Sequence, residues 1–331
     1  MNTTLEKPIA ITTIGGGSGQ YALLAGLRSL EDVNITAVVS MVDSGGSTGR
    51  LRDELGILPP GDILKCILAL SPHRNVLRSL FLKRFTNDRR LKGHTAGNML
   101  LTMLSRYTGS FPAGVNALCE LLDAKGMVLP VTIDRATLVA ELTDGSRIFG
   151  EAAIDMPRGT QREQINNVYL VPHHAESISV FPPVLEAISL ADYIITGPGD
   201  LFTSIIPNLI VPQVKEALQS TRGKLIFVIN IMTKFGETHA FTGKDFVKQL
   251  ENLLERPFDA IIYNSQKPEE EILTSYLAQK ARFVEIDRND SFWTHRNVFQ
   301  SDLLDTGGGV VRHDSKKLAA LIHRIMQEGS I

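Results

Sequence analysis

Short apolar stretches alternate with amphipathic stretches at the start of the chain. Residues 9–14 are apolar and β-branched, which is typical of a strand buried on both faces. Residues 20–27 have the three- and four-residue apolar spacing of a helix, and residues 35–42 form a second buried stretch. This alternation predicts parallel strands joined by right-handed crossovers.

The pattern then changes twice. Residues 60–126 are mainly helical in their apolar spacing and contain no strand signal. From about residue 128 the pattern favours strands, and Asp144-Gly145 between residues 138–142 and 147–152 predicts a hairpin, because this dipeptide tolerates the positive φ of a primed turn. Residues 168–171 and 178–181 extend this β-rich stretch to about residue 182. We therefore expect a helical segment and a β-rich insertion at 128–182, closed by two prolines.

After residue 182 the strand-helix alternation resumes. Residues 193–196, 225–229, 260–263 and 283–286 read as short buried strands. The first three end at polar loops, and loops that follow parallel strands share one edge of the sheet, where ligands bind. The chain is thus predicted to be one α/β domain over residues 1–331, with a mostly parallel sheet. The residues of these loops that we single out are Gly197, Gly199, Asn230, Thr233 and Asn264.

Composition narrows the class of protein. With 331 residues and 43% hydrophobic content the chain can bury a large core, and a net charge of −2 without long basic runs argues against a nucleic-acid partner. The two cysteines lie in apolar helical patterns, which argues against disulfides and zinc knuckles. No signal-type or membrane-spanning stretch is expected. We expect a cytoplasmic protein.

A glycine loop directly follows the first predicted strand. Glycines let a ligand oxyanion approach the backbone N–H groups, and the helix that follows offers its N-terminus to an anion. A second loop follows the next strand. The fingerprint of dinucleotide enzymes is incomplete, because no acidic residue ends that strand, so NAD is not expected. A tight turn without a ligand is the alternative. The residues of the two loops are Gly15, Gly16, Gly17, Ser18, Gly19, Gln20, Asp43, Ser44, Gly45, Gly46 and Ser47.

A few polar residues elsewhere complete the candidate site. His94 and Asn98 can share one face at the start of a helix, although capping of that helix is the alternative role. Asp43 and Asp62 could hold a divalent cation such as Mg²⁺, because hard cations prefer oxygen ligands, while a helix cap explains Asp62 equally well. Arg312 could pair with phosphate or form a surface ion pair.

Several motifs in fixed order resemble the CofD-like superfamily, and most closely its bacterial YvcK branch, the gluconeogenesis factors. The resemblance covers nearly the whole chain. It rests on residues 15–19, 45–52, 59–62, 93–98, 197–199 and 203–208, with residues 232–233, 236–238 and 313–314.

The resemblance implies a three-layer, Rossmann-like α/β fold. CofD itself transfers a phospholactyl group from a nucleotide diphosphate donor with a divalent ion, whereas the YvcK branch implies a nucleotide-sugar binder required for cell shape and wall synthesis during gluconeogenic growth. A UDP-sugar-like ligand is our first expectation and a CofD-type transferase the alternative. A homo-oligomer and an unidentified protein partner are left open.

The chain departs from the family pattern at three places. Ser44 stands where a second aspartate is common, which weakens the expected metal site. Ile63-Leu64-Lys65 stands where an Arg-Asn pair is common, and Asp200 stands where a serine or threonine is usual, with Phe202 in place of a tyrosine. A changed ligand preference follows from these departures.

Overall fold

The computed structural model describes residues 7–87, 91–157, 159, 161–329 and 331. Its centre is a seven-stranded sheet with the order β10-β9-β8-β7-β1-β2-β3, in which every neighbouring pair is parallel. The strands of this sheet are β1 (Ile9–Gly15), β2 (Val33–Val39), β3 (Met127–Pro130), β7 (Tyr193–Thr196), β8 (Lys224–Val228), β9 (Ala260–Asn264) and β10 (Val298–Ser301).

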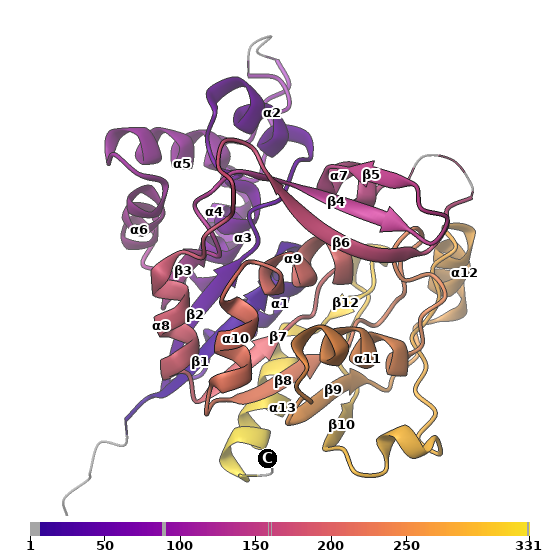
Figure 1. Cartoon of the computed structure of the whole chain (residues 1–331). Helices are drawn as coiled ribbons and strands as arrows, with labels where there is room; N and C mark the ends of the chain where they lie inside the picture. Colours follow the sequence, from indigo (N-terminus) through magenta and orange to yellow (C-terminus); the bar gives the residue numbers. More distant parts are fainter. Residues whose placement is uncertain (1–6, 88–90, 158, 160, 330) are drawn as a thin grey trace, which may run out of the picture.

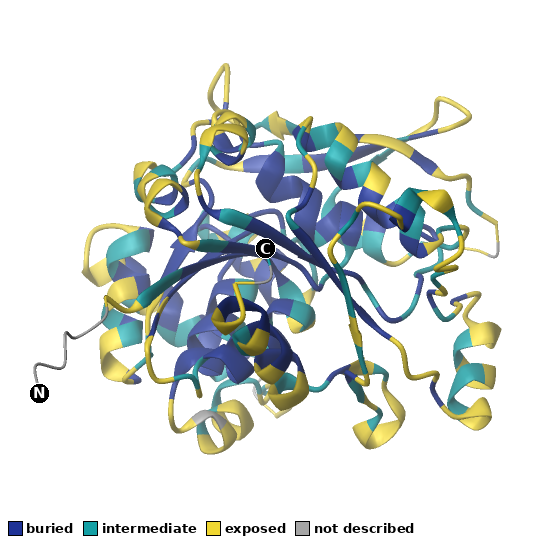
Figure 2. Cartoon of the chain, turned by 90° about the horizontal axis from the view of Figure 1, so that it is seen from below, coloured by how far each residue is buried: buried dark blue, intermediate teal, exposed yellow. Residues whose placement is uncertain are grey.

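Helices cover both faces of the sheet, which gives three layers (Figure 1). On one face α1 (Gly17–Leu27) packs against α3 (Gly61–Leu70) and α13 (Ser315–Gln327). On the other face α10 (Val214–Ser220) packs against α8 (Pro182–Leu190) and α11 (Gly243–Leu254). The strands are the most deeply buried elements, and the exposed residues lie on the outer helix faces and loops (Figure 2). The predicted α/β class and mostly parallel sheet are confirmed.

The helical segment lies beside β2 and β3. Besides α3 it contains α4 (Arg74–Phe81), α5 (Ala96–Tyr107) and α6 (Phe111–Leu121). Helix α2 (Gly46–Leu55) precedes the segment. Thr95 and Ser110 accept backbone N–H groups at the starts of α5 and α6, which fixes where these helices begin. Remaining helical elements are α9 (Ile206–Leu209), which follows a π-helical turn at Leu201–Ile205, and α12 (Glu270–Ala278).

A three-stranded antiparallel sheet forms the insertion. It has the order β5-β4-β6, with β4 at Ala136–Leu142, β5 at Arg147–Phe149 and β6 at Ile165–Pro172. The short helix α7 (Glu151–Asp155) follows β5, and the insertion extends across the carboxyl edge of the main sheet (Figure 1). The C-terminal segment adds a two-stranded pair, β11 (Leu304–Asp305) and β12 (Arg312–His313).

Four details differ from the sequence-based expectation. The strand near residue 128 is β3, which joins the main sheet by pairing with β2. Gly150 has φ +90° and ends β5, so the residues after it form α7. Residues 178–181 are not a strand, and Pro182 begins α8, where its missing N–H is not needed. Residues 283–286 contribute only an isolated bridge, and β10 takes the place at the sheet edge.

None of the helices in the described residues is long and apolar enough to cross a membrane.

Candidate functional site

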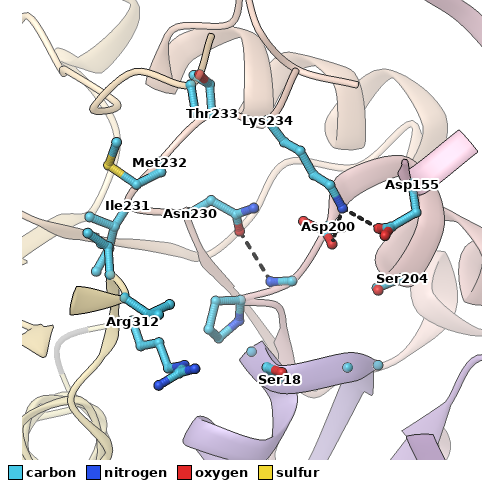
Figure 3. A pocket seen from close by; sticks show the side chains of 18 of the residues that line it. Ser18, Asp155, Asp200, Ser204, Asn230, Ile231, Met232, Thr233, Lys234 and Arg312 are labelled. Atoms are coloured by element: carbon cyan, nitrogen blue, oxygen red, sulfur yellow. Dashed lines mark hydrogen bonds and ion pairs between the residues drawn. The ribbon is translucent and has the colours of Figure 1, made fainter. Parts of the chain in front are cut away.

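A hollow of about 800 Å³ lies at the carboxyl edge of the main sheet, and we call it the main hollow (Figure 3). The loops after β1, β2, β7 and β8 meet there, with α7 of the insertion and the C-terminal segment. The loop after β9 does not line it. The structure thus brings these predicted site residues together: Gly16, Gly17, Ser18, Gly19, Asp43, Asp62, Gly199, Asn230, Thr233 and Arg312.

The glycine loop opens directly into the main hollow and begins α1 at Gly17, whose φ is +65°. No side chain caps the helix, so the backbone N–H groups of its first turn face the hollow without an intrahelical partner. At Gly19 a Cβ atom would lie 2.3 Å from the Pro198 carbonyl oxygen, so this glycine is required where two loops meet. The arrangement is suited to an anion.

Two of the loops are joined by side chains. Asn230 Oδ1 accepts the N–H of Gly199 at 3.2 Å, and Asn208 Nδ2 donates to the Gly15 carbonyl at 2.9 Å. Thr233 exchanges two hydrogen bonds with the backbone of Arg282, at 2.7 and 2.8 Å. These bonds fix the loops after β7 and β8 at the edge of the main hollow.

Other predicted residues lie behind the main hollow. Gln20 is buried, and its Nε2 donates to Thr13 Oγ1 and to the Val38 carbonyl, both at 3.1 Å, which ties α1 to β1 and β2. Asn264 bonds the backbone of Gln266 and Leu303. None of the predicted residues in this group lines the main hollow: Gly15, Gln20, Ser44, Gly45, Gly46, Ser47, His94, Asn98, Gly197 and Asn264.

Ser47, His94 and Asn98 form a buried network at the start of α2. Ser47 Oγ lies 3.1 Å from His94 Nδ1, and Asn98 Nδ2 donates to Ser47 Oγ at 3.3 Å. The pKa of His94 is lowered by burial and by the charge of Arg50. Thr95, not His94, caps α5. The network therefore positions the second glycine loop against the helical segment.

Acidic groups are concentrated beside the glycine loop. The pKa of Asp43 is raised by burial and by the nearby Asp62 carboxylate. Lys65 Nζ bonds Asp62 Oδ1 at 2.8 Å, and although burial lowers the pKa of Lys65, the Asp62 carboxylate raises it above its usual value. Burial and the charge of Asp43 raise the pKa of Glu151 to about 7. The mutual repulsion of these carboxylates is the kind that a cation relieves.

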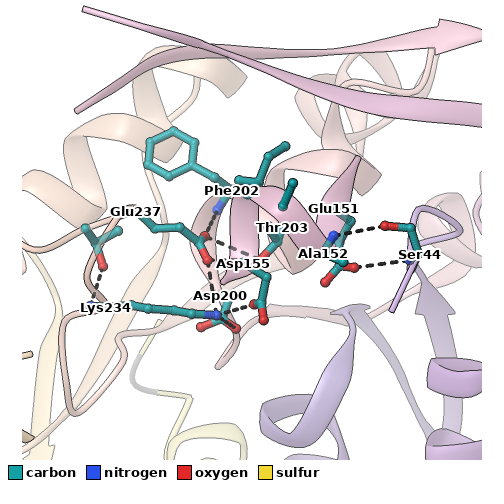
Figure 4. Close-up of polar contacts among 12 residues, drawn as sticks. Ser44, Glu151, Ala152, Asp155, Asp200, Phe202, Thr203, Lys234 and Glu237 are labelled. Atoms are coloured by element: carbon teal, nitrogen blue, oxygen red, sulfur yellow. Dashed lines mark hydrogen bonds and ion pairs between the residues drawn. The ribbon is translucent and has the colours of Figure 1, made fainter. Parts of the chain in front are cut away.

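Ser44 joins the second glycine loop to the insertion (Figure 4). Its N–H donates to Glu151 Oε2 at 3.1 Å, and its Oγ accepts the N–H of Ala152 at 2.9 Å. Gly150 provides no side-chain cap for α7, so Ser44 caps that helix from a distant part of the sequence. This gives a structural reason for a serine where the family pattern has an aspartate.

Lys234 lies at the centre of a second acidic group (Figures 3 and 4). Its Nζ pairs with Asp155, with Asp200 at 2.8 Å and with Glu237 at 3.2 Å. Glu237 also accepts hydrogen bonds from Phe202 N and Thr203 Oγ1, and its pKa is raised by burial and by Asp200. We call these four charged residues the Lys234 cluster. Its three carboxylates lie within 4.8 Å of one another, but the lysine ammonium already neutralises them in part.

Two residues of β12 line the remaining wall. Arg312 is exposed, whereas His313 is buried, and burial lowers the pKa of His313 to about 4. The Nε2 atom of His313 is buried without a hydrogen-bond partner in the described residues. A neutral imidazole therefore offers one unused polar atom beside the main hollow.

Sequence reasoning did not single out several residues of the main hollow. Lys65 was named only as a departure from the family pattern, although it lies three residues after Asp62, a helical spacing that could have indicated the ion pair. The other residues lie in segments that only the fold brings to the sheet edge, and no local pattern marks them. They are Glu151, Asp155, Lys234 and Tyr276, whereas Asp200 and His313 were named only in the comparison with the family pattern.

Comparison with known proteins agrees with this architecture. Residues 11–304 match the family described as 2-phospho-L-lactate transferase CofD. A Thermotoga maritima relative is 42% identical over 95% of this chain and 98% of its own length. The Bacillus subtilis protein named gluconeogenesis factor is 38% identical over 98% of this chain and 99% of its own. A crystal structure of a Bacillus halodurans protein superposes with a TM-score of 0.88 at 33% identity, over 96% of this chain and 100% of that one. The chain therefore belongs to the CofD family, among relatives named gluconeogenesis factors.

Proposed function

We propose that the chain is a cytoplasmic protein that binds a nucleotide sugar, of the UDP-sugar type, in the main hollow. The observation that carries the proposal is the uncapped N-terminus of α1 with its glycine loop, which opens into a hollow of about 800 Å³. The diphosphate would lie on Gly16–Gly19, and Asn230, Thr233 and Arg312 would bind the rest of the ligand.

The charge of the main hollow bears on how a diphosphate could bind. Asp43, Asp62, Glu151 and the carboxylates of the Lys234 cluster oppose an anion, and the cations that line the hollow are Lys65, Lys234 and Arg312. Asp43 and Asp62 supply the oxygen ligands that Mg²⁺ prefers, so these residues fit a divalent cation. When bound, the cation would neutralise phosphate charge.

Ligand binding is tested by thermal shift with uridine, guanosine and adenosine diphosphate compounds, with and without Mg²⁺. A ligand that binds only the native protein raises the melting temperature. We expect a uridine diphosphate sugar to give the largest shift, greater with Mg²⁺ than with EDTA. Arg312→Met should reduce the shift, whereas Arg222→Met, an exposed arginine before β8 at the other edge of the sheet, should not. No shift with any nucleotide would contradict the proposal.

A CofD-type transferase is the second candidate. Glu151 favours it, since a carboxyl with a pKa of about 7 beside the glycine loop can exchange protons at neutral pH. Our proposal expects the nucleotide sugar to be bound without being consumed. Turnover of a nucleotide diphosphate donor at about one per second or faster, lost in Asp43→Asn, would support the transferase instead.

We propose as the cellular role the support of cell shape and wall synthesis during gluconeogenic growth, and the name of the Bacillus subtilis relative, gluconeogenesis factor, supports only the link to gluconeogenic growth. Expression of this chain in a Bacillus subtilis strain that lacks the relative should restore growth on a gluconeogenic carbon source. If the Arg312→Met variant no longer bound the nucleotide but still restored normal growth, the cellular role would not depend on nucleotide binding. Size-exclusion chromatography and affinity capture address the homo-oligomer and the protein partner.

A further inference from the structure

A second hollow, of about 550 Å³, lies next to the main hollow and differs from it in charge. We call it the basic hollow. Phe235 lines both hollows, so they are neighbours at the same edge of the molecule. The basic hollow is lined by Gln161, Arg162, Glu163, Phe235, His239, Leu277, Lys280 and Arg282.

Arg162 has unused hydrogen-bonding capacity in this wall. Its Nη1 donates to the carbonyls of Ala153 and Ile154, at 3.3 and 2.8 Å, which holds the guanidinium against α7. Its Nε and Nη2 atoms are buried and have no hydrogen-bond partner in the described residues. A buried, unpaired guanidinium donor is costly, and a missing water or anion is a usual reason for one.

The charged side chains that line the basic hollow are mostly positive. Lys280 Nζ lies 4.7 Å from the centre of the Phe235 ring, and Arg282 is exposed and has no ion pair in the described part of the chain. His239 has a lowered pKa because of burial and the charges of Lys280 and Arg162, and it stays neutral near pH 7. Among the described residues that line the basic hollow, three cations accompany a single carboxylate, and the charge of Glu237 acts on Arg162 from outside this lining.

The carboxylate belongs to Glu163, and its hydrogen-bond partner is Thr143, which does not line the basic hollow. Glu163 Oε2 accepts a hydrogen bond from Thr143 Oγ1 at 3.3 Å. It forms no salt bridge with the three cations in the described residues. The described residues that line the basic hollow therefore carry a net positive charge, in contrast to the carboxylate-rich main hollow.

We propose that the basic hollow binds a phosphorylated small molecule, distinct from the ligand of the main hollow. Two arginines and a lysine match the oxygen geometry and the double negative charge of a phosphate group. The Phe235 ring and the Leu277 side chain provide apolar wall for an organic part, and 550 Å³ is within the range of small-molecule sites. The proposal does not rest on the nucleotide-sugar function.

The two hollows are connected by a short loop. A Cβ atom on Gly236 would lie 3.1 Å from Arg162 Cδ, so Arg162 packs directly on this loop, whose neighbours Lys234 and Glu237 belong to the Lys234 cluster. On its other side Arg162 holds the carbonyls of α7, the helix that carries Asp155. An anion bound at Arg162 would therefore act, through this side chain, on the loop and the helix that carry the Lys234 cluster.

The experiment uses pyrophosphate as the probe in calorimetric titrations at constant ionic strength. Arg282→Glu changes an exposed side chain, and the Thr233 bonds are made by the backbone of this residue, so the variant should fold normally. We expect it to weaken pyrophosphate binding about tenfold or more. Arg222→Glu makes the same charge change at a distant exposed site and should leave the affinity unchanged. Equal affinities in both variants and the unmodified protein would overturn the proposal.

Hydrogen exchange locates the probe independently of any substitution. Pyrophosphate should slow exchange in residues 161–163, which line the basic hollow and not the main hollow. Protection limited to residues 16–20 would place the anion at the glycine loop and refute a separate site. A UDP-sugar should not remove the protection of residues 161–163 by pyrophosphate, whereas complete loss of this protection would assign the basic hollow to the phosphates of the nucleotide.

Discussion

At the scale of single residues, glycines with similar sequence context have different structural roles. Gly17 has φ +65°, and the nearest atom to an added Cβ is Ser204 Oγ at 3.7 Å, so only its backbone conformation is special. Gly19 has no unusual φ, but an added Cβ would lie 2.3 Å from the Pro198 carbonyl oxygen. Gly17 is thus specified by conformation and Gly19 by packing.

We expect Gly19→Ala to be the more damaging of two matched substitutions. Gly17→Ala should lower the free energy of unfolding by about 1–2 kcal/mol, the cost of a left-handed backbone at a residue with a side chain. Gly19→Ala should cost about 3 kcal/mol, because backbone must move to relieve the overlap. Urea unfolding of both variants measures the difference. Equal losses would show that the loops separate more easily than the structure indicates.

Glu151 should make stability depend on pH. The folded protein raises its pKa to about 7, so it binds this proton more tightly than the unfolded chain, whose value is near 4.3. The resulting stabilisation is complete below about pH 4.3 and is lost as the pH rises to 7. Relative to Glu151→Gln, the unmodified protein should lose about 1–3 kcal/mol between pH 5 and 8 in urea unfolding. The exposed Glu176→Gln variant is the control and should follow the unmodified protein.

At the scale of elements, the insertion is held to the main sheet by few polar contacts at its helix α7. Ser44 caps this helix from the second glycine loop, and Glu151 returns a hydrogen bond to the Ser44 backbone. The short helix has five residues and only one buried side chain, Ile154. Its formation therefore depends on the loop that caps it.

Ser44→Ala should weaken this connection. The variant removes the cap of α7, which typically costs about 1 kcal/mol. Hydrogen exchange in residues 150–156 should become faster, while the core strands β1 and β2 remain protected. Ser189→Ala is a matched control, because its hydroxyl bonds only within α8. Unchanged exchange in residues 150–156 would mean that the insertion is held by its apolar contacts.

The elements also differ in how well the sequence predicts them. Strands β1, β2, β7, β8 and β9 are marked by β-branched runs that end at glycine or polar loops, and their positions follow from this local signal. The edge strand β10 has the residues Val-Phe-Gln-Ser and lacks such a run. Helix α7 depends on a cap whose hydrogen bond joins residues 108 positions apart in sequence, so no local pattern predicts it.

The residues of the candidate site also differ in how well the sequence predicts them. The glycine loop, Asp43 and Asn230 follow strands directly and were predicted to meet at the sheet edge, as they do. His94 and Asn98 have the residue types of a ligand site, but their hydrogen bonds are used to position Ser47. Lys234 and Glu151 face the main hollow because of tertiary contacts. Their roles could not be derived without knowing where the insertion lies.

At the scale of the whole molecule, the Lys234 cluster connects three distant segments. Asp155 comes from the insertion, Asp200 follows β7, and Lys234 and Glu237 follow β8. The side chain of Glu237 is 1% exposed, whereas those of Asp155 and Asp200 are partly exposed. The lysine therefore compensates one deeply buried carboxylate and joins it to two solvated ones.

Lys234→Met should destabilise the protein by about 3 kcal/mol, because removal of one partner leaves a buried charge uncompensated. The double variant Lys234→Met/Glu237→Gln should recover part of this loss, since the buried charge is then absent as well. Thermal and urea unfolding of the single and double variants measure the coupling. A double variant less stable than Lys234→Met would show that Glu237 stabilises the fold through its bonds to Phe202 and Thr203 instead.

The strand order also determines how the chain can fold during synthesis. β1 lies between β2 and β7, and the strand that covers its second edge begins at Tyr193. At typical translation rates that strand leaves the ribosome on the order of 10–40 s after β1. Until then the backbone N–H and C=O groups along this edge of β1 have no native partner strand. The nascent chain should therefore depend on chaperones, and refolding should be slow and concentration-sensitive compared with small helical proteins.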